Sequence, residues 1–238
     1  MIQIKEKIGI VIQARMSSTR LPGKVLMEFC GLPLLLFLIK ILKEFNIGAA
    51  IVIATSNHAK DDRIESFCKA HRIDYIRGSE SNVFKRFQVA AETFDFDHII
   101  RITGDNPLTN YRILTSSLNT HLETGADLTS TRKIRQDRTI ERYAPKGNSI
   151  DVINCSTLMG IDANTLDDFE REHVIPVFYS GPYRISYVKT KLRTDFSYSI
   201  DDLYDFERVE DVANQLLRNG SLLTALGYEQ SSIDNDQN

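Results

Sequence analysis

Three basic residues enclose a short loop of small side chains near the start of the chain, in the sequence QARMSSTRLPGK at 13–24. Arg15, Arg20 and Lys24 can neutralise phosphate charge, and Ser18 adds a hydroxyl donor. Small residues let backbone and side-chain donors approach phosphate oxygens closely. The spacing indicates a triphosphate-binding loop. The loop matches neither of the two commonest phosphate-binding motifs, GxGxxG and GxxxxGK[ST]. An ordinary basic turn exposed to solvent is therefore the alternative interpretation.

Two carboxylates that are far apart in the sequence could meet this loop. Asp105 follows an apolar run at 98–103, in the turn TGDNP, and Asp201 ends the alternating segment 198–200. Mg²⁺ takes oxygen ligands and often binds through one or two carboxylates plus substrate phosphates. We therefore predict that Asp105 and Asp201 form a magnesium site. Simpler interpretations are a turn-forming role for Asp105 and a helix cap at Asp202.

One histidine stands beside an arginine in a helical pattern. Arg171 and His173, in EREHVIPVFY, could contact a substrate carboxylate or hydroxyl, although a lone histidine is more often structural. The remaining histidines show no metal-ligand spacing such as HExxH. The chain also lacks a GxSxG elbow, which argues against acyl transfer.

Short β-rich runs alternate with helical patterns through the first hundred residues. The predicted strands are 8–13, 50–54, 73–77 and 98–103. The predicted helices are 34–45, 61–71 and 81–94. Consecutive βαβ units produce a mostly parallel sheet, so we predict an α/β fold whose ligand lies at the carboxyl ends of the strands.

The pattern changes at about residue 126, where a strand, a polar excursion and a second strand replace the tight βα turns. We interpret 126–155 as a small insertion, with a role in dimerisation or as a lid, within a single domain at 1–228. We expect the polar tail at 229–238 to fray. The excursion carries five basic residues, Arg132, Lys133, Arg135, Arg138 and Arg142. They could serve an anionic substrate or a partner subunit, but a solvated charged face is the simpler interpretation.

The composition limits the class of partner. The 29 Lys and Arg residues nearly balance the 32 Asp and Glu residues, which argues against a nucleic-acid partner. The first seven residues lack the apolar core of a signal peptide, and no apolar run approaches the roughly 20 residues that span a membrane. We therefore expect a cytoplasmic protein that binds small molecules. The three cysteines are widely spaced and indicate no disulfide framework.

The chain resembles the cytidylyltransferase family over roughly residues 8 to 210. The resemblance rests on six collinear segments, QARMSSTRLPGK, ATSN, RGSESNVFKRF, RITGDNPL, REHVIPVFY and YSIDD. The nearest branch contains the spore coat polysaccharide biosynthesis proteins of the SpsF type, which are related to acylneuraminate and 3-deoxy-manno-octulosonate cytidylyltransferases. The resemblance implies a three-layer α/β/α nucleotide-diphospho-sugar transferase fold and a homodimer.

The resemblance also implies a reaction and a set of roles. Mg²⁺-dependent transfer of CMP from CTP to a sugar acid or related sugar would release pyrophosphate, in surface polysaccharide or glycan biosynthesis. Asp105 and Asp201 would bind the metal, and Arg171 and His173 would face the acceptor. The catalytic set would be Arg15, Lys24 and Asp105. The nucleotide-binding set would be Ala14, Arg15, Ser18, Arg20, Lys24, Thr55, Arg77, Ser79 and Glu80.

One departure from the family pattern is Ser17, which stands where the nearest branch has glycine. If the loop needs a positive φ there, the side chain would cost roughly 1 kcal/mol. This departure motivates one alternative function, a catalytically silent nucleotide-binding subunit. Glycosyl transfer from a nucleotide sugar is the other alternative, but the DFD sequence at 95–97 precedes its strand and is misplaced for that chemistry.

Overall fold

The computed structural model describes residues 6–192 and 196–227. The described chain is built around a central sheet of seven strands, in the order β11-β7-β10-β6-β1-β4-β5. Strands β1, β4, β5 and β6 run parallel, β10 is antiparallel to β6 and β7, and β11 is parallel to β7. The strand bounds are β1 Ile8–Gln13, β4 Ala50–Ser56, β5 Asp74–Gly78, β6 His98–Thr103, β7 Leu128–Ser130, β10 Asp151–Asn154 and β11 Ile185–Tyr187.

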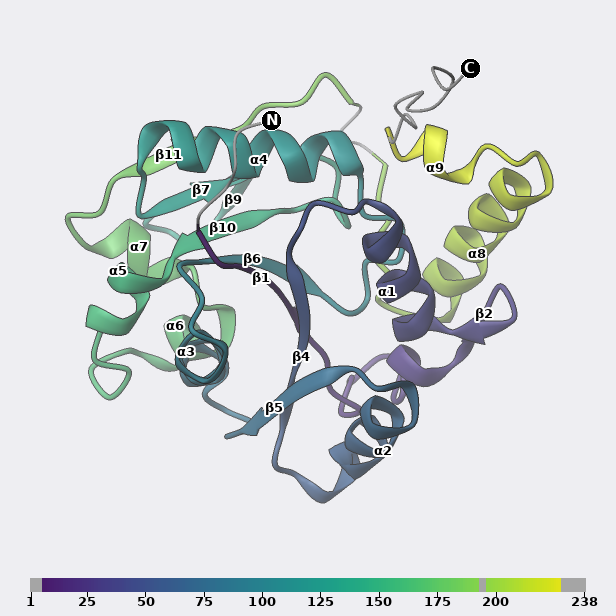
Figure 1. Cartoon of the computed structure of the whole chain (residues 1–238), viewed down its shortest axis with the longest axis horizontal. Helices are drawn as coiled ribbons and strands as arrows, with labels where there is room; N and C mark the ends of the chain where they lie inside the picture. The colour runs from purple at the N-terminus through teal and green to yellow at the C-terminus, as the bar shows by residue number, and fades with distance from the viewer. Residues whose placement is uncertain (1–5, 193–195, 228–238) are drawn as a thin grey trace, which may run out of the picture.

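Helices cover both faces of this sheet. Figure 1 places α3 and α6 on one side and α1 and α8 on the other. The helix bounds are α1 Leu34–Glu44, α2 Asp62–His71, α3 Val83–Phe94, α4 Tyr111–Thr124, α5 Cys155–Gly160, α6 Asp168–His173, α7 Pro176–Ser180, α8 Leu203–Arg218 and α9 Leu222–Ala225. The architecture is therefore the three-layer α/β/α arrangement with a mostly parallel sheet that the sequence predicted.

Alternation along β1 explains the two apolar cores. Ile10 and Ile12 pack in the cluster that contains Leu38 of α1, whereas Val11 packs in the cluster that contains Phe87 of α3. Successive side chains of a strand point to opposite faces, so a strand covered on both faces is apolar at every position. The continuous run IGIVI is thus the signature of a central strand.

Most element boundaries agree with the sequence prediction to within two residues. β1 and β6 have the predicted bounds, but β4 continues to Ser56 because Thr55 and Ser56 still pair with β5. α3 begins at Val83, two residues later than predicted, because Asn82 caps it and accepts a hydrogen bond from Lys85 N at 2.8 Å.

The segment 126–155 contributes directly to the central sheet. Its first and last strands, β7 and β10, pair with each other, and β10 also pairs with β6. Between them, β8 (Arg132–Ile134) and β9 (Ile140–Arg142) form a separate antiparallel hairpin. A further two-stranded ladder, β2 (Glu28–Phe29) with β3 (Leu32–Pro33), precedes α1.

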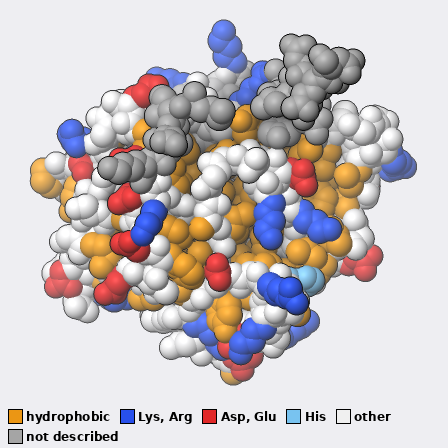
Figure 2. All heavy atoms as spheres, viewed as in Figure 1, with side chains coloured by type: hydrophobic (Ala, Val, Ile, Leu, Met, Phe, Trp, Pro, Cys, Tyr) orange, Lys and Arg blue, Asp and Glu red, His pale blue; other side chains and the backbone are white. Residues whose placement is uncertain are grey.

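The molecular surface is mixed in charge. On the face drawn in Figure 2, Lys and Arg side chains are interspersed with Asp and Glu among the residues drawn in colour. In the described ranges, no helix is long and apolar enough to cross a membrane.

Two histidines form a buried polar link between the sheet and α4. His98 Nδ1 lies 3.1 Å from His121 Nε2, and His121 Nδ1 lies 3.1 Å from Thr129 Oγ1. The side chain of His121 is fully buried. Burial, and then the neighbouring His98, lower the pKa of His121 from 6.5 to about 4. His121 is therefore neutral in the folded protein at neutral pH.

We predict that this link makes the fold sensitive to acid. Between pH 6.5 and about 4 the unfolded chain binds a proton at His121 that the folded chain does not, so stability falls as the pH falls through this window. The contribution is about 1.4 kcal/mol for each pH unit. Urea unfolding of the wild type and His121→Gln at several pH values measures it. The variant should show a shallower loss between pH 6.5 and 4, and identical slopes would contradict the prediction.

Candidate active site

A cavity of about 440 Å³ opens at the carboxyl ends of β1 and β6. This is the edge at which parallel α/β sheets bind ligands, and the volume suits a small molecule. Its walls come from the loop after β1, the turn after β6, the β8–β9 hairpin, α6 and the segment before α8. The polar and charged lining includes Arg15, Ser18, Arg20, Lys24, Arg86, Arg101, Asp105, Arg132, Arg142, Lys146, Glu172, His173, Ser199 and Asp201.

The backbone of Met16 fixes the loop after β1. The Met16 carbonyl accepts hydrogen bonds from Ser18 N at 3.0 Å and Gly23 N at 2.9 Å. The Met16 amide donates to Asp61 Oδ1 at 2.7 Å. These bonds fold the segment back on itself, and Lys24 then begins a 3₁₀ turn that ends at Leu26. The loop cations Arg15, Arg20 and Lys24 are thereby directed to one cavity.

The loop has no backbone strain at Ser17. Among the described residues, Ser17 is not one of those with a positive φ, and the left-handed conformation is taken by Gly23 at a φ of 76°. Ser17 Oγ instead donates to Glu80 Oε1 at 2.6 Å. The strain considered from the sequence is therefore absent, because the turn places its left-handed residue six positions later.

Lys24 joins the loop to two other chain segments. Its buried Nζ donates to Asp105 Oδ2 at 2.6 Å and to the carbonyl of Ile200 at 2.5 Å. The second oxygen of Asp105 accepts from Thr103 Oγ1 at 2.7 Å. The Ile200 amide also donates to the Asp105 carbonyl at 3.0 Å. These contacts hold the turn after β6 against the residue that precedes Asp201.

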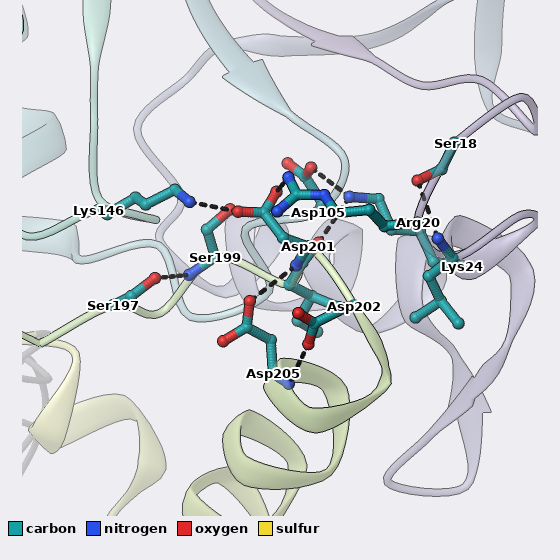
Figure 3. Close-up of polar contacts among 12 residues, drawn as sticks. Ser18, Arg20, Lys24, Asp105, Lys146, Ser197, Ser199, Asp201, Asp202 and Asp205 are labelled. Carbon is teal, nitrogen blue, oxygen red and sulfur yellow. Dashed lines mark hydrogen bonds and ion pairs between the residues drawn. The ribbon is translucent and has the colours of Figure 1, made fainter.

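Asp201 lies between two cations on the same cavity (Figure 3). Arg20 Nη2 contacts Asp201 Oδ1 at 2.9 Å, and Lys146 Nζ contacts Oδ2. Burial alone would raise the pKa of Asp201, but the hydrogen bond from Lys146 and the nearby positive charges outweigh it and lower the pKa. Asp202 points elsewhere: its Oδ1 accepts from Asp205 N at 2.9 Å and caps α8.

A second group of cations surrounds the fully buried Asp151 on β10. Arg101 Nη1 and Arg132 Nη2 both contact Asp151 Oδ2, at 3.0 and 2.7 Å. Arg142 pairs in register with Arg132 across the hairpin and donates to Ser149 Oγ at 3.3 Å. We call Arg101, Arg132 and Arg142 the arginine cluster. All three line the cavity, whereas Lys133, Arg135 and Arg138 line a separate hollow beside α6 and α7.

Several residues in and beside this cavity were not predicted from the sequence. Arg86, Arg101 and Lys146, which line it, were not candidates, and neither was Asp151, which contacts two lining arginines. Arg132 and Arg142 were candidates only as part of a charged run. One available signal was Arg101, because it is the charged residue within the otherwise apolar strand HIIRIT. A buried charge inside a central strand needs a partner, which here is Asp151.

Several predicted site residues lie outside the lining of the cavity. Thr55 is fully buried in β4, and Ser79 contacts Ser81. The Arg77 guanidinium contacts Asp62 at 2.7 Å and Glu65, both on α2. Arg171 donates to the carbonyl of Asn164 at 2.9 Å. Glu80 contacts the loop through Ser17.

Of the two residues predicted to face the acceptor, His173 lines the cavity and Arg171 does not. Burial lowers the pKa of His173, and nearby Glu172 opposes this effect. The positive charges of Arg101, Arg132 and Arg15 lower it further. The imidazole therefore favours its neutral form.

Cations and carboxylates face one cavity at the carboxyl edge of a mostly parallel sheet, which helices cover on both faces. This arrangement is typical of nucleotide-binding α/β proteins. Comparison with known proteins identifies the family. The family model described as Cytidylyltransferase matches residues 9–221. The chain belongs to the cytidylyltransferase family and is a nucleotidyltransferase.

Individual relatives agree with this assignment. The chain is 32% identical over 213 residues to the spore coat polysaccharide biosynthesis protein SpsF of Bacillus subtilis, covering 85% of each chain. It is 26% identical to a cytidylyltransferase from Leptospira borgpetersenii, whose structure superposes with a TM-score of 0.77 over 97% of this chain and 100% of the other. The structure of a CMP:2-keto-3-deoxy-manno-octonic acid synthetase complexed with CTP shares the fold, at 18% identity and a TM-score of 0.69, over 88% of this chain and 99% of the other.

We predict that Gly23 is required for the loop conformation. A Cβ at this position would meet Met16 Cε at 3.1 Å in a left-handed backbone with φ of 76°. Gly23→Ala should therefore lower the free energy of unfolding by about 1 kcal/mol or more. Gly160→Ala is the matched control, because a Cβ there meets nothing within 4 Å and its φ is not positive. Urea unfolding compares them, and equal effects of the two variants would contradict the prediction.

Proposed function

We propose that this nucleotidyltransferase transfers CMP from CTP to a sugar acid or related sugar and releases pyrophosphate, in surface polysaccharide or glycan biosynthesis. The observation that carries the proposal is that the loop cations, Asp105 and Asp201 line one cavity although they come from three distant segments. The names of the relatives, an SpsF protein and a CMP-sugar synthetase, support the choice of nucleotide and acceptor.

In this proposal the loop cations bind the triphosphate. Lys24 and Arg20 already contact carboxylates, at 2.6 and 2.9 Å, so each side chain is held toward the cavity before any nucleotide binds. When the sugar hydroxyl attacks the α-phosphorus, the bond to the bridging oxygen breaks and negative charge develops on the leaving pyrophosphate. Preorganised cations stabilise that charge without having to reorient.

The residues of the cavity fit a divalent ion. Asp105 and Asp201 are oxygen donors of the kind that Mg²⁺ prefers, and Mg²⁺ commonly completes its shell with phosphate oxygens and water. No group of three or more His, Cys, Asp or Glu residues in the described ranges could hold a metal without such help. We propose that Asp105 and Asp201 hold Mg²⁺ together with CTP. When bound, the ion supplies positive charge at the α-phosphate and lowers the pKa of a neighbouring hydroxyl.

The direct test of the function is pyrophosphate release. The purified protein is incubated with Mg²⁺, each of the four nucleoside triphosphates and a panel of sugar acids. Pyrophosphate and a CMP-sugar should appear with CTP and at least one acceptor. Turnover of a nucleotide sugar with no release of pyrophosphate from CTP would instead support glycosyl transfer, and binding of CTP without turnover would support a silent subunit.

We predict that Lys24→Ala lowers kcat by about 100-fold or more, because it removes a cation aimed at the leaving group. Lys60→Ala is the control, since Lys60 is exposed and outside the cavity. Steady-state kinetics with pyrophosphate readout measure both variants, and a thermal unfolding scan verifies that they are folded. Wild-type turnover by the Lys24 variant would remove this residue from the proposed mechanism.

We predict that removal of divalent ions with a chelator abolishes turnover and that added Mg²⁺ restores it. Asp201→Asn should raise the Mg²⁺ concentration required for half-maximal activity by about tenfold or more, because it removes a carboxylate charge from the proposed site. The adjacent Asp202→Asn is a matched control, since asparagine caps a helix as well as aspartate does. An identical Mg²⁺ requirement in both variants would exclude Asp201 as a ligand.

A further inference from the structure

A buried carboxylate contacts the loop after β1 from behind the cavity. Asp61 ends the short 3₁₀ turn Ala59–Asp61, which lies between β4 and α2, and the residue is only 1% exposed. Its Oδ1 accepts a hydrogen bond from the Met16 amide at 2.7 Å. Asp61 does not line the cavity, so an effect on a bound nucleotide has to pass through the residues that Asp61 contacts.

The position of Asp61 in the chain suggests a different role from the one its contacts show. An aspartate directly before a helix commonly caps it by accepting from backbone amides of the first turn. Asp61 directly precedes α2, but its side chain makes no capping hydrogen bond. Oδ2 instead accepts from Ser56 N at 3.2 Å and from Ser56 Oγ. One carboxylate oxygen therefore binds the end of β4, and the other binds the loop after β1.

Met16 is the residue through which this contact can control the loop. The Met16 carbonyl accepts from Ser18 N and Gly23 N, at 3.0 and 2.9 Å, so the turn that carries the loop cations closes on Met16. Arg15 directly precedes Met16, and Lys24 directly follows Gly23. Without Asp61 the buried Met16 amide would lose its acceptor, and an unpaired buried donor favours a shift of the backbone toward another partner. Such a shift would change the direction of the loop cations.

Arg77 fixes the turn that carries Asp61. Arg77 Nε donates to the Ser56 carbonyl at 2.9 Å, and Nη2 donates to the His58 carbonyl at 3.2 Å. The same guanidinium pairs with two carboxylates of α2. A guanidinium that uses several donors at once adds geometric specificity to its contacts. Asp61 is thus held in place by hydrogen bonds that do not involve the cavity.

The negative charge of Asp61 also acts on the cations of the cavity. Arg86 lines the cavity and is 2% exposed. Burial lowers the pKa of Arg86 to about 10, and the positive charge of Arg15 lowers it further. The carboxylates of Asp61 and Glu80 oppose both effects. Asp61 therefore helps to keep two like charges, Arg15 and Arg86, on one cavity.

We propose that Asp61 is a positioning residue of the nucleotide site, which sets the direction of the loop cations by holding the Met16 amide. The inference rests on the proposed function for the role of these cations, which is to bind the triphosphate. Asp61 then controls affinity for the triphosphate group and leaves affinity for the nucleoside and the acceptor unchanged. Ser56, on the other oxygen of the carboxylate, contributes to the fold alone.

A binding experiment on the full chain tests this inference without turnover. An unreactive α,β-methylene analogue of CTP, inorganic triphosphate and CMP are titrated separately in the presence of Mg²⁺. Asp61→Ala should weaken binding of the first two by about tenfold or more, the loss expected when a buried donor is left unpaired. Its affinity for CMP should stay close to that of the wild type. Wild-type affinity for inorganic triphosphate, or an equal loss of affinity for CMP, overturns the proposal.

Ser56→Ala is the matched control. This substitution removes a hydrogen bond from the same carboxylate but leaves the Met16 amide paired. It should lower the free energy of unfolding without weakening triphosphate binding. An equal loss of triphosphate affinity in Ser56→Ala and Asp61→Ala would mean that Asp61 acts through the fold alone, and it overturns the proposal.

Hydrogen exchange in the wild type is a second test, which stands even if Asp61→Ala does not fold. The Met16 amide is hydrogen-bonded in the loop conformation that directs the cations to the cavity. Inorganic triphosphate at 100 times its Kd should therefore slow exchange of this amide by about 100-fold, since the ligand binds only that conformation. An exchange rate that triphosphate does not change overturns the proposal.

Failure of the inference and failure of the proposed function give different results. If the wild type releases no pyrophosphate with any acceptor, but Asp61→Ala still loses triphosphate affinity, the proposed function is refuted and the role of Asp61 is supported. Where the wild type turns over, kcat/KM for CTP in Asp61→Ala should fall by the same factor as the affinity, with no change in the KM for the acceptor. A rise confined to the KM for the acceptor refutes the inference while the function stands.

Discussion

The contacts of Lys24 hold the candidate site together. This buried ammonium donates to Asp105 and to the Ile200 carbonyl, so it connects the loop after β1, the turn after β6 and the segment before α8. The backbone bond from Ile200 N to Asp105 O closes the same junction. A single cation thereby sets the positions of two carboxylates that are far apart in the sequence. Because its charge is compensated by Asp105, Lys24 can be buried at moderate cost before a ligand arrives.

Electrostatic surplus distinguishes this cavity from the rest of the molecule. Elsewhere among the described residues, some basic side chains form one-to-one pairs, such as Arg135 with Glu141 and Arg138 with Asp167. In the arginine cluster, two buried guanidinium groups share one carboxylate. A protein that needed only stability would replace such a group or pair it fully.

Local sequence patterns predicted the part of the structure that depends on neighbouring residues. The buried strands β1 and β6 followed from their apolar runs, and Asp105 lies on the predicted cavity because it follows the end of β6. Asp201 also lies on the cavity, but the segment 198–200 before it forms no strand and is held by an isolated bridge between Ser197 and Lys146. The contact of Arg101 with Asp151 could not be predicted in this way, since it depends on β10 pairing antiparallel to β6 across 50 positions. Arg77 shows the reverse case, because its position at the carboxyl end of a strand was predicted but its partners on α2 were not.

The conformation of the loop also bears on whether the protein is catalytically silent. Ser17 was the sequence feature that motivated this alternative, through the strain that a side chain suffers at a positive φ. The structure places the positive φ at Gly23, and Ser17 contributes a hydrogen bond to Glu80. The loop cations and both carboxylates still line the cavity. The feature of the sequence that motivated the silent alternative therefore has no counterpart in the backbone of the loop, and turnover with CTP is the measurement that separates the two functions.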